Sequence, residues 1–246
     1  MISLAWRCRG CHYSRANGAS LMAASGVVTR SAKQRTWNSA AKVLASAAIL
    51  IVAFAFIIKY AIPLYLHYNE ASYTDDAPNH WALRRWLLMH ITGGAAALLA
   101  GPWQFWTGFR RRFARLHRWT GWIFLSGVAI GSVGAFRLAI GTAFGWAWGF
   151  ALLALTTAWV TTSGMAYYAI LKRRVAIHKE WMVRAYVVTF AFVTFRILNN
   201  YYPAERLQPS GDRAVTFAWA CWVLPLLFTE LILQFRRMRV SVSSSS

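Results

Sequence analysis

The sequence predicts an all-α fold, a polytopic bundle of about six transmembrane helices with both termini cytoplasmic. Of its 246 residues, 58% are hydrophobic, and the charged residues, only 14% of the chain, lie between long apolar runs. The surface of a water-soluble domain of this size could not accommodate so many apolar side chains. The 14 Trp, 15 Phe and 10 Tyr exclude intrinsic disorder.

Six apolar segments are long enough to cross the hydrocarbon core of a bilayer, which takes about 20 helical residues. Backbone groups in lipid must be hydrogen-bonded within their own segment, and the runs show no strand-like alternation, so we expect helices and not a barrel. The segments are 41–63, 86–106, 119–140, 146–171, 181–199 and 214–235. They form one expected transmembrane domain over 41–237, between a basic, disordered arm (1–40) and a disordered tail (238–246).

The net charge of +20 first suggests nucleic acid as a partner. The basic residues, however, lie in short loops beside apolar segments, where they orient a membrane protein and contact anionic headgroups. Most of them fall in the N-terminal arm, in alternate loops and in the tail, which by the positive-inside rule places both termini in the cytoplasm. We therefore expect the lipid bilayer, and not nucleic acid, as the partner.

The N-terminal arm contains Cys8-Arg9-Gly10-Cys11-His12, the CxxCH pattern to which c-type haem is attached. Such haems are attached outside the cytoplasmic membrane, whereas the charge pattern places this arm inside, so we interpret the match as chance. Residues 1–21 lack the apolar core of a secretory signal, and Met22 is an alternative start, which would make them a start-site artefact.

Ionisable residues inside the spans need a partner or water, because each costs free energy in lipid. One group lies near the inner face: His117, His178, Arg184 and Glu230. His117 and His178 begin two helices that run in the same direction. They could hold the iron of one b-type haem, with Arg184 or the loop arginines pairing with its propionates. Alternatively, both histidines are interfacial residues satisfied by lipid phosphate. Glu230 either pairs with a cytoplasmic arginine or handles protons.

A second group lies near the outer face: His90, Arg137 and Arg196. It suggests an anion or quinone-headgroup site opening outward, and we expect the three residues to line one cavity. The alternative is a hydrogen-bonded cluster between helices, with the arginines extended to the outer headgroups. His90 is too far along its helix to share a haem with His117 and His178.

Small residues are closely spaced in the second and third segments, at Gly93, Gly94, Gly127 and Gly131. The pattern Gly127-x-x-x-Gly131 is typical of helices whose backbones approach closely. We therefore expect these two segments to form a tight antiparallel hairpin.

An ordered motif series resembles a bacterial family of predicted integral membrane proteins catalogued only as a domain of unknown function. The motifs are His90-Ile91-Thr92-Gly93, Gly101-Pro102-Trp103-Gln104-Phe105, Leu116-His117-Arg118-Trp119-Thr120-Gly121, His178-Lys179-Glu180-Trp181-Met182-Val183-Arg184 and Thr194-Phe195-Arg196. The resemblance covers roughly 86–200 and implies a multi-pass protein of the bacterial inner membrane, with no established activity. A looser similarity links the chain to b-haem membrane reductases, which use paired histidines. The fourth segment has no histidine, which departs from their two-haem pattern.

Two functional hypotheses follow. The first is a membrane redox protein with one b-type haem on His117 and His178 that exchanges electrons with quinone. The second is a non-enzymatic protein, either a transporter that binds its ligand at the outer site or an accessory subunit of a membrane complex. No nucleotide-binding or hydrolase motif stands in the sequence where its chemistry could work, so a nucleotide-driven or hydrolytic mechanism has no support.

Overall fold

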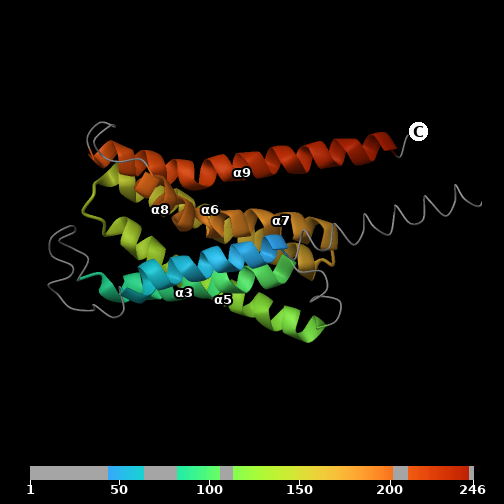
Figure 1. Cartoon of the computed structure of the whole chain (residues 1–246), viewed down its shortest axis with the longest axis horizontal. Coiled ribbons are helices and arrows are strands. Elements are labelled where there is room, and N and C mark those ends of the chain that lie inside the picture. Colours follow the sequence, from blue (N-terminus) through green and yellow to red (C-terminus); the bar gives the residue numbers. More distant parts are fainter. Residues whose placement is uncertain (1–43, 64–81, 106–112, 202–209, 244–246) are drawn as a thin grey trace, which may run out of the picture. The chain divides into compact units, whose positions relative to one another are not determined.

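The computed structural model describes residues 44–63, 82–105, 113–201 and 210–243, and all regular structure in these ranges is helical (Figure 1). Contacts divide the chain into two units, Met1–Ala45 and Ser46–Ser246, and the fold below is that of the second. The predicted arm, with Cys8, Cys11 and His12, lies outside the described residues.

The helices follow the predicted segments closely. The first apolar helix, Leu44–Ala61, ends in a π-helical turn, η1 (Ile57–Ala61). The others are α3 (Arg84–Phe105), α5 (Ala114–Ile140), α6 (Trp146–Leu171), α7 (Val175–Thr189), α8 (Ala191–Tyr201) and α9 (Ser210–Ser243). Since α9 continues to Ser243, residues 238–243 of the expected tail are helical.

Five helical segments of the described chain are long and apolar enough to cross a membrane: Leu44–Ala61, Ala114–Ile140, Trp146–Leu171, Val175–Asn200 and Arg213–Met238. The 22-residue α3 coincides with the remaining predicted span but is not among these five. Its glycines, His90 and Pro102 lower its mean hydropathy. The all-α transmembrane bundle is thus confirmed.

Large apolar side chains lie on the outer surface of these helices. Ile51 is 68% exposed, Trp146 85% and Phe235 60%. Monomeric soluble proteins rarely expose continuous apolar surface of this extent, whereas lipid solvates it. The bilayer is therefore the environment that this exterior fits.

The predicted hairpin of α3 and α5 is confirmed, and glycine makes it possible. A Cβ atom on Gly93 would lie 2.5 Å from the Gly127 carbonyl oxygen and 2.7 Å from the Gly131 Cα. Any side chain at these positions would therefore push the two backbones apart. The helices α3 and α6 each pack against both α5 and α7, which places α5 and α7 on opposite sides of a four-helix interior.

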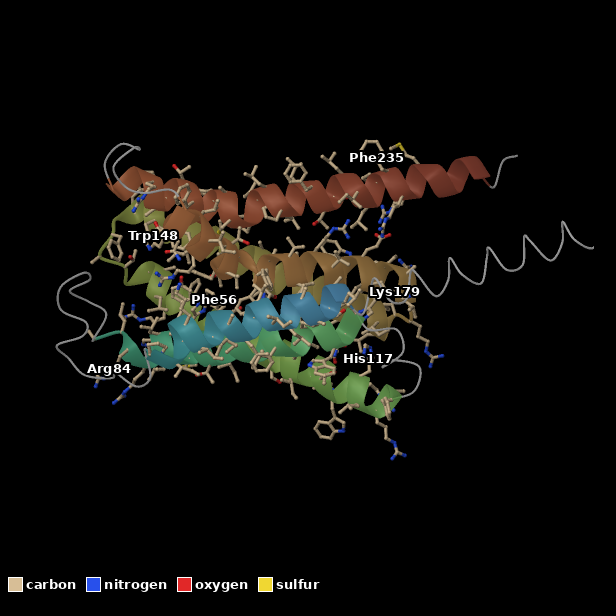
Figure 2. All side chains as sticks on the ribbon, viewed as in Figure 1. Phe56, Arg84, His117, Trp148, Lys179 and Phe235 are labelled. Atoms are coloured by element: carbon tan, nitrogen blue, oxygen red, sulfur yellow. The ribbon has the colours of Figure 1, made fainter. Side chains whose placement is uncertain are left out.

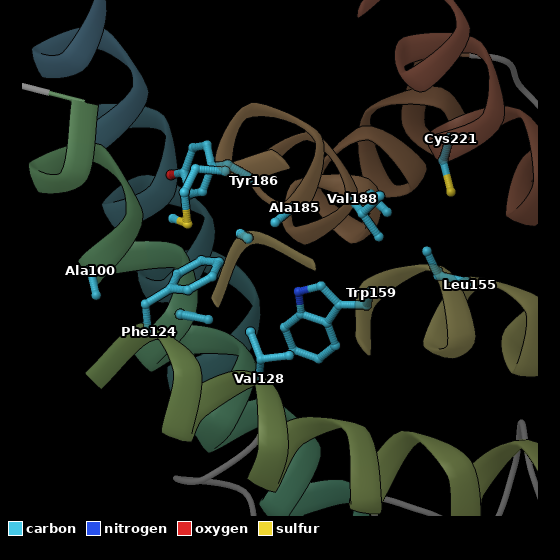
Figure 3. Close-up of a cluster of buried hydrophobic side chains, with 13 residues drawn as sticks. Ala100, Phe124, Val128, Leu155, Trp159, Ala185, Tyr186, Val188 and Cys221 are labelled. Atoms are coloured by element: carbon cyan, nitrogen blue, oxygen red, sulfur yellow. The ribbon is translucent and has the colours of Figure 1, made fainter. Parts of the chain in front are cut away.

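Buried aromatic side chains pack together in this interior. Phe124 from α5, Trp159 from α6 and Tyr186 from α7 belong to one buried cluster (Figure 3). Two hydrogen bonds satisfy its polar atoms: the Tyr186 hydroxyl donates to the Leu98 carbonyl at 2.9 Å, and the Trp159 indole donates to the Thr189 hydroxyl at 2.8 Å. The cluster thereby joins α3, α5, α6 and α7.

The fifth predicted span is divided at Phe190. The helix α7 ends just before this residue, at Thr189, and α8 begins just after it, at Ala191. Thr189 donates its hydroxyl to the Ala185 carbonyl at 2.8 Å while accepting the Trp159 indole. Threonine that bonds back to the preceding turn can bend a helix, but Thr156 and Thr162 make the same bond within the continuous α6, so this bond alone does not explain the break.

We predict that Gly93→Ala lowers the stability of the purified protein in detergent by about 1 to 3 kcal/mol, because the added methyl group overpacks the α3–α5 contact. The neighbouring Gly94→Ala is the matched control: a Cβ atom there meets nothing within 4 Å. Thermal unfolding of the two variants, followed by tryptophan fluorescence, measures the difference. Equal midpoints would contradict the close contact.

Candidate functional site

The two histidines predicted near the inner face lie at the same end of the bundle. Figure 2 shows His117 and Lys179, the neighbour of His178, at one end, and Arg84 and Trp148 at the other. The inner-face histidines thus lie at the end of the bundle opposite to Arg84 and Trp148.

Both histidines lie on helix faces that turn inward. His117 is half-buried between exposed neighbours, and Phe124, two turns further along α5, belongs to the buried cluster. His178 is likewise half-buried, and Met182, one turn further along α7, belongs to the same cluster. The side chains therefore start from facing sides of the four-helix interior.

A backbone contact holds the ring of His178, whereas the bonds near His117 reach its carbonyl and a neighbouring hydroxyl. The Nδ1 atom of His178 lies 2.8 Å from the Ala166 carbonyl of α6. Because a carbonyl only accepts, Nδ1 carries a hydrogen and donates this bond, so in the neutral form of the ring the lone pair is on Nε2. Near His117, the Gln104 amide of α3 donates to the His117 carbonyl at 3.2 Å and to the Thr120 hydroxyl at 2.5 Å.

Arg184, predicted near the same face, is buried and bound to carboxylates. Its Nε and Nη2 atoms donate to one oxygen of Glu230 on α9 at 2.9 and 2.6 Å, and its Nη1 lies 3.8 Å from Glu180. The guanidinium also lies 4.8 Å from the centre of the Trp181 ring. Glu230 thus pairs with an arginine inside the bundle, on α7, and Arg237 of α9 pairs with Glu180.

The three residues predicted near the outer face have different surroundings in the described part of the chain, and the pocket that Arg196 lines includes neither His90 nor Arg137. His90 lies in the interior: its Nδ1 is 3.0 Å from the Gly131 carbonyl, and its ring packs edge-on against Phe192, with centroids 5.5 Å apart. Arg137 is exposed, beside Gly141 at the C-terminal end of α5. Arg196 lines a pocket of its own.

This pocket has a volume of about 330 Å³ and is lined by the first apolar helix and α8. Its lining residues are Phe56, Lys59, Tyr60, Val193, Arg196, Ile197 and Asn200. Lys59 and Tyr60 are not among the site residues predicted from the sequence. A signal was present in the sequence, since Lys59 is a charge within an apolar segment and such charges are rare without a role.

Among the described residues, no group of three or more His, Cys, Asp or Glu side chains gathers in a way that could hold a metal ion. A haem iron takes only two axial side chains, so a haem is a separate question from a metal cluster of this kind.

The comparisons with known proteins give one match. A family model described as a predicted membrane protein (DUF2306) matches residues 87–233, from the start of α3 to the middle of α9. No curated protein and no solved structure matches the chain.

We predict that Glu230→Leu destabilises the protein by about 1 to 3 kcal/mol in detergent, because it removes the closest partner of a buried guanidinium. The double variant Arg184→Leu with Glu230→Leu should recover part of this loss, since an apolar pair of similar volume replaces the ion pair. Gln234→Leu, at an exposed partner of Glu230, is the control, with a change within about 0.5 kcal/mol. A Glu230→Leu effect no larger than the control would refute the role of the pair.

Proposed function

The chain belongs to the DUF2306 family of predicted membrane proteins, and we propose that it is a membrane redox protein with one b-type haem held by His117 and His178. The observation that carries the proposal is the placement of both histidines on inward faces of α5 and α7, at the same end of one four-helix interior. Two imidazoles from opposite helices are a common way to occupy both axial positions of a haem iron.

The hydrogen bond of His178 supports this role. Histidines that bind iron usually donate their other ring nitrogen to a carbonyl or carboxylate, which fixes the tautomer and the ring orientation. The bond from Nδ1 of His178 to Ala166 has this form and directs Nε2 away from α6. When bound, a b-type haem supplies one-electron chemistry, and we propose quinone as its exchange partner.

The propionates need cations other than Arg184, whose donors are engaged by Glu230 and Glu180. Arg118, next to His117, and Lys179, next to His178, are exposed at the same end of the bundle. We propose that they take this part.

One observation favours a second candidate, a non-enzymatic transporter or an accessory subunit of a membrane complex. The pocket at Arg196 is lined by two cations and two aromatic rings, which suits the binding of an anion or a lipid. This candidate needs no haem, so the two hypotheses differ in a single spectroscopic property.

We also propose that the protein lies in the bacterial inner membrane with both termini in the cytoplasm. The concentration of Lys and Arg in the N-terminal arm, the alternate loops and the C-terminal end supports this orientation.

Protein purified from haem-supplied cells should show a Soret band that shifts on reduction with dithionite. His117→Ala and His178→Ala should each lose it, because each removes an axial ligand. His90→Ala is the control and should keep the band, because His90 is engaged with α5 in another part of the interior. A colourless wild-type protein would exclude the redox hypothesis. Loss of the band only in the His90 variant would show that His117 and His178 are not the ligands of the haem.

A reporter fused after Ser246 should reveal the orientation. Green fluorescent protein at this position should fluoresce, whereas alkaline phosphatase should be inactive, because it needs export to form its disulfides. Active phosphatase at the same position would reverse the proposed topology.

A further inference from the structure

In the pocket between the first apolar helix and α8, two cations lie near the same aromatic ring. The ammonium group of Lys59 lies 5.5 Å from the centre of the Tyr60 ring, and the guanidinium of Arg196 lies 5.4 Å from it. Among the residues that the structure describes, no carboxylate forms an ion pair with either cation. Two like charges near one ring leave a local excess of positive charge that an anion would neutralise.

The Tyr60 hydroxyl is a further polar group of the pocket. The Asn200 side-chain amide donates to the Tyr60 hydroxyl at 2.6 Å. Because the hydroxyl oxygen accepts this bond, its own hydrogen remains able to donate in another direction. Tyr60 therefore adds a neutral donor to the two cations.

The helix geometry at the pocket is unusual. Lys59 and Tyr60 belong to the π-helical turn Ile57–Ala61. Such turns are rare and occur frequently at functional sites, where the wider backbone changes the direction of the side chains. Arginines and lysines near span ends usually extend separately to the headgroups, whereas these two lie over a shared ring.

The rest of the lining is apolar. Phe56, Val193 and Ile197 complete the pocket, and the neighbouring Ile58 and Ile62 of the first helix are exposed on its outer surface. The pocket is also close to the ends of both helices, where headgroups lie. A volume of about 330 Å³ lies at the lower end of the range for small-ligand sites.

We propose that this pocket binds the phosphate of an anionic phospholipid, with Lys59, Arg196 and Tyr60 on the phosphate and the acyl chains along the first apolar helix. A neutral quinone headgroup would leave both cations without a counter-charge. Inorganic phosphate shares the ligand chemistry but would gain nothing from the apolar lining. The inference does not depend on haem binding.

The test is native mass spectrometry of the full-length protein, titrated in detergent with phosphatidylglycerol, phosphatidylcholine or inorganic phosphate. We expect phosphatidylglycerol to bind more tightly than the other two. Lys59→Met and Arg196→Met should each weaken it about fivefold, and the double variant about 25-fold, as expected for the loss of one headgroup-binding cation at a time.

Arg137→Met is the matched control, because it removes an exposed arginine that lies outside the pocket. It should bind phosphatidylglycerol like the wild type. Thermal unfolding without added lipid confirms that each variant is folded, and if the double variant is lost, the single variants carry the comparison.

Three outcomes would overturn the proposal. They are unchanged binding in folded Lys59 and Arg196 variants, an equal loss in Arg137→Met, and inorganic phosphate binding as tightly as phosphatidylglycerol. The last result would assign the pocket to a free anion. Arg196→Lys should retain most of the affinity, because it keeps the positive charge that binds the phosphate.

Discussion

The contact between the backbones of α3 and α5 is the constraint on which the arrangement of the other helices depends. Gly93 faces Gly127 and Gly131 at a separation that leaves no room for a Cβ atom. In lipid, helices gain little from burying apolar area, so close packing of this kind and hydrogen bonds between helices hold them together. Here the two coincide, because His90 of α3 bonds to the Gly131 carbonyl. Fixed by this contact, α3 presents the Leu98 carbonyl to Tyr186, and α5 contributes Phe124 to the buried cluster.

A second, electrostatic connection holds the C-terminal part of the bundle. Arg184 of α7 is buried, and Glu230 of α9 is its closest partner. Moving an unpaired guanidinium into a membrane interior is costly, so the charge favours the docking of α9 against α7 over their separation. Glu180 and Arg237 extend the connection toward the end of the bundle.

The positions of the spans could be predicted from the sequence, because the hydropathy of a segment depends only on its own residues and not on the segments that pack against it. The glycine hairpin could be predicted for a similar reason, since small residues at one spacing mark one helix face. The break at Phe190 could not, because no glycine or proline marks it in the sequence. Nor could the separation of His90, Arg137 and Arg196, because their depths were estimated from their spans while their directions around the helix axes depend on packing. Lys59 and Arg196 share a pocket for the same reason: they are far apart in sequence, and only the fold brings them together.

The length of α9 has a practical consequence. At 1.5 Å per residue its 34 residues extend about 51 Å, whereas a bilayer with its headgroups is about 40 to 45 Å thick. An upright α9 is therefore longer than the membrane is thick, and at the average tilt of about 20° it still spans about 48 Å, so one of its ends stands in water as continuous helix. A fluorophore or affinity label attached to such an end would be held by a rigid helix. Distances measured from it would therefore report the tilt of α9 and not the motion of a flexible linker.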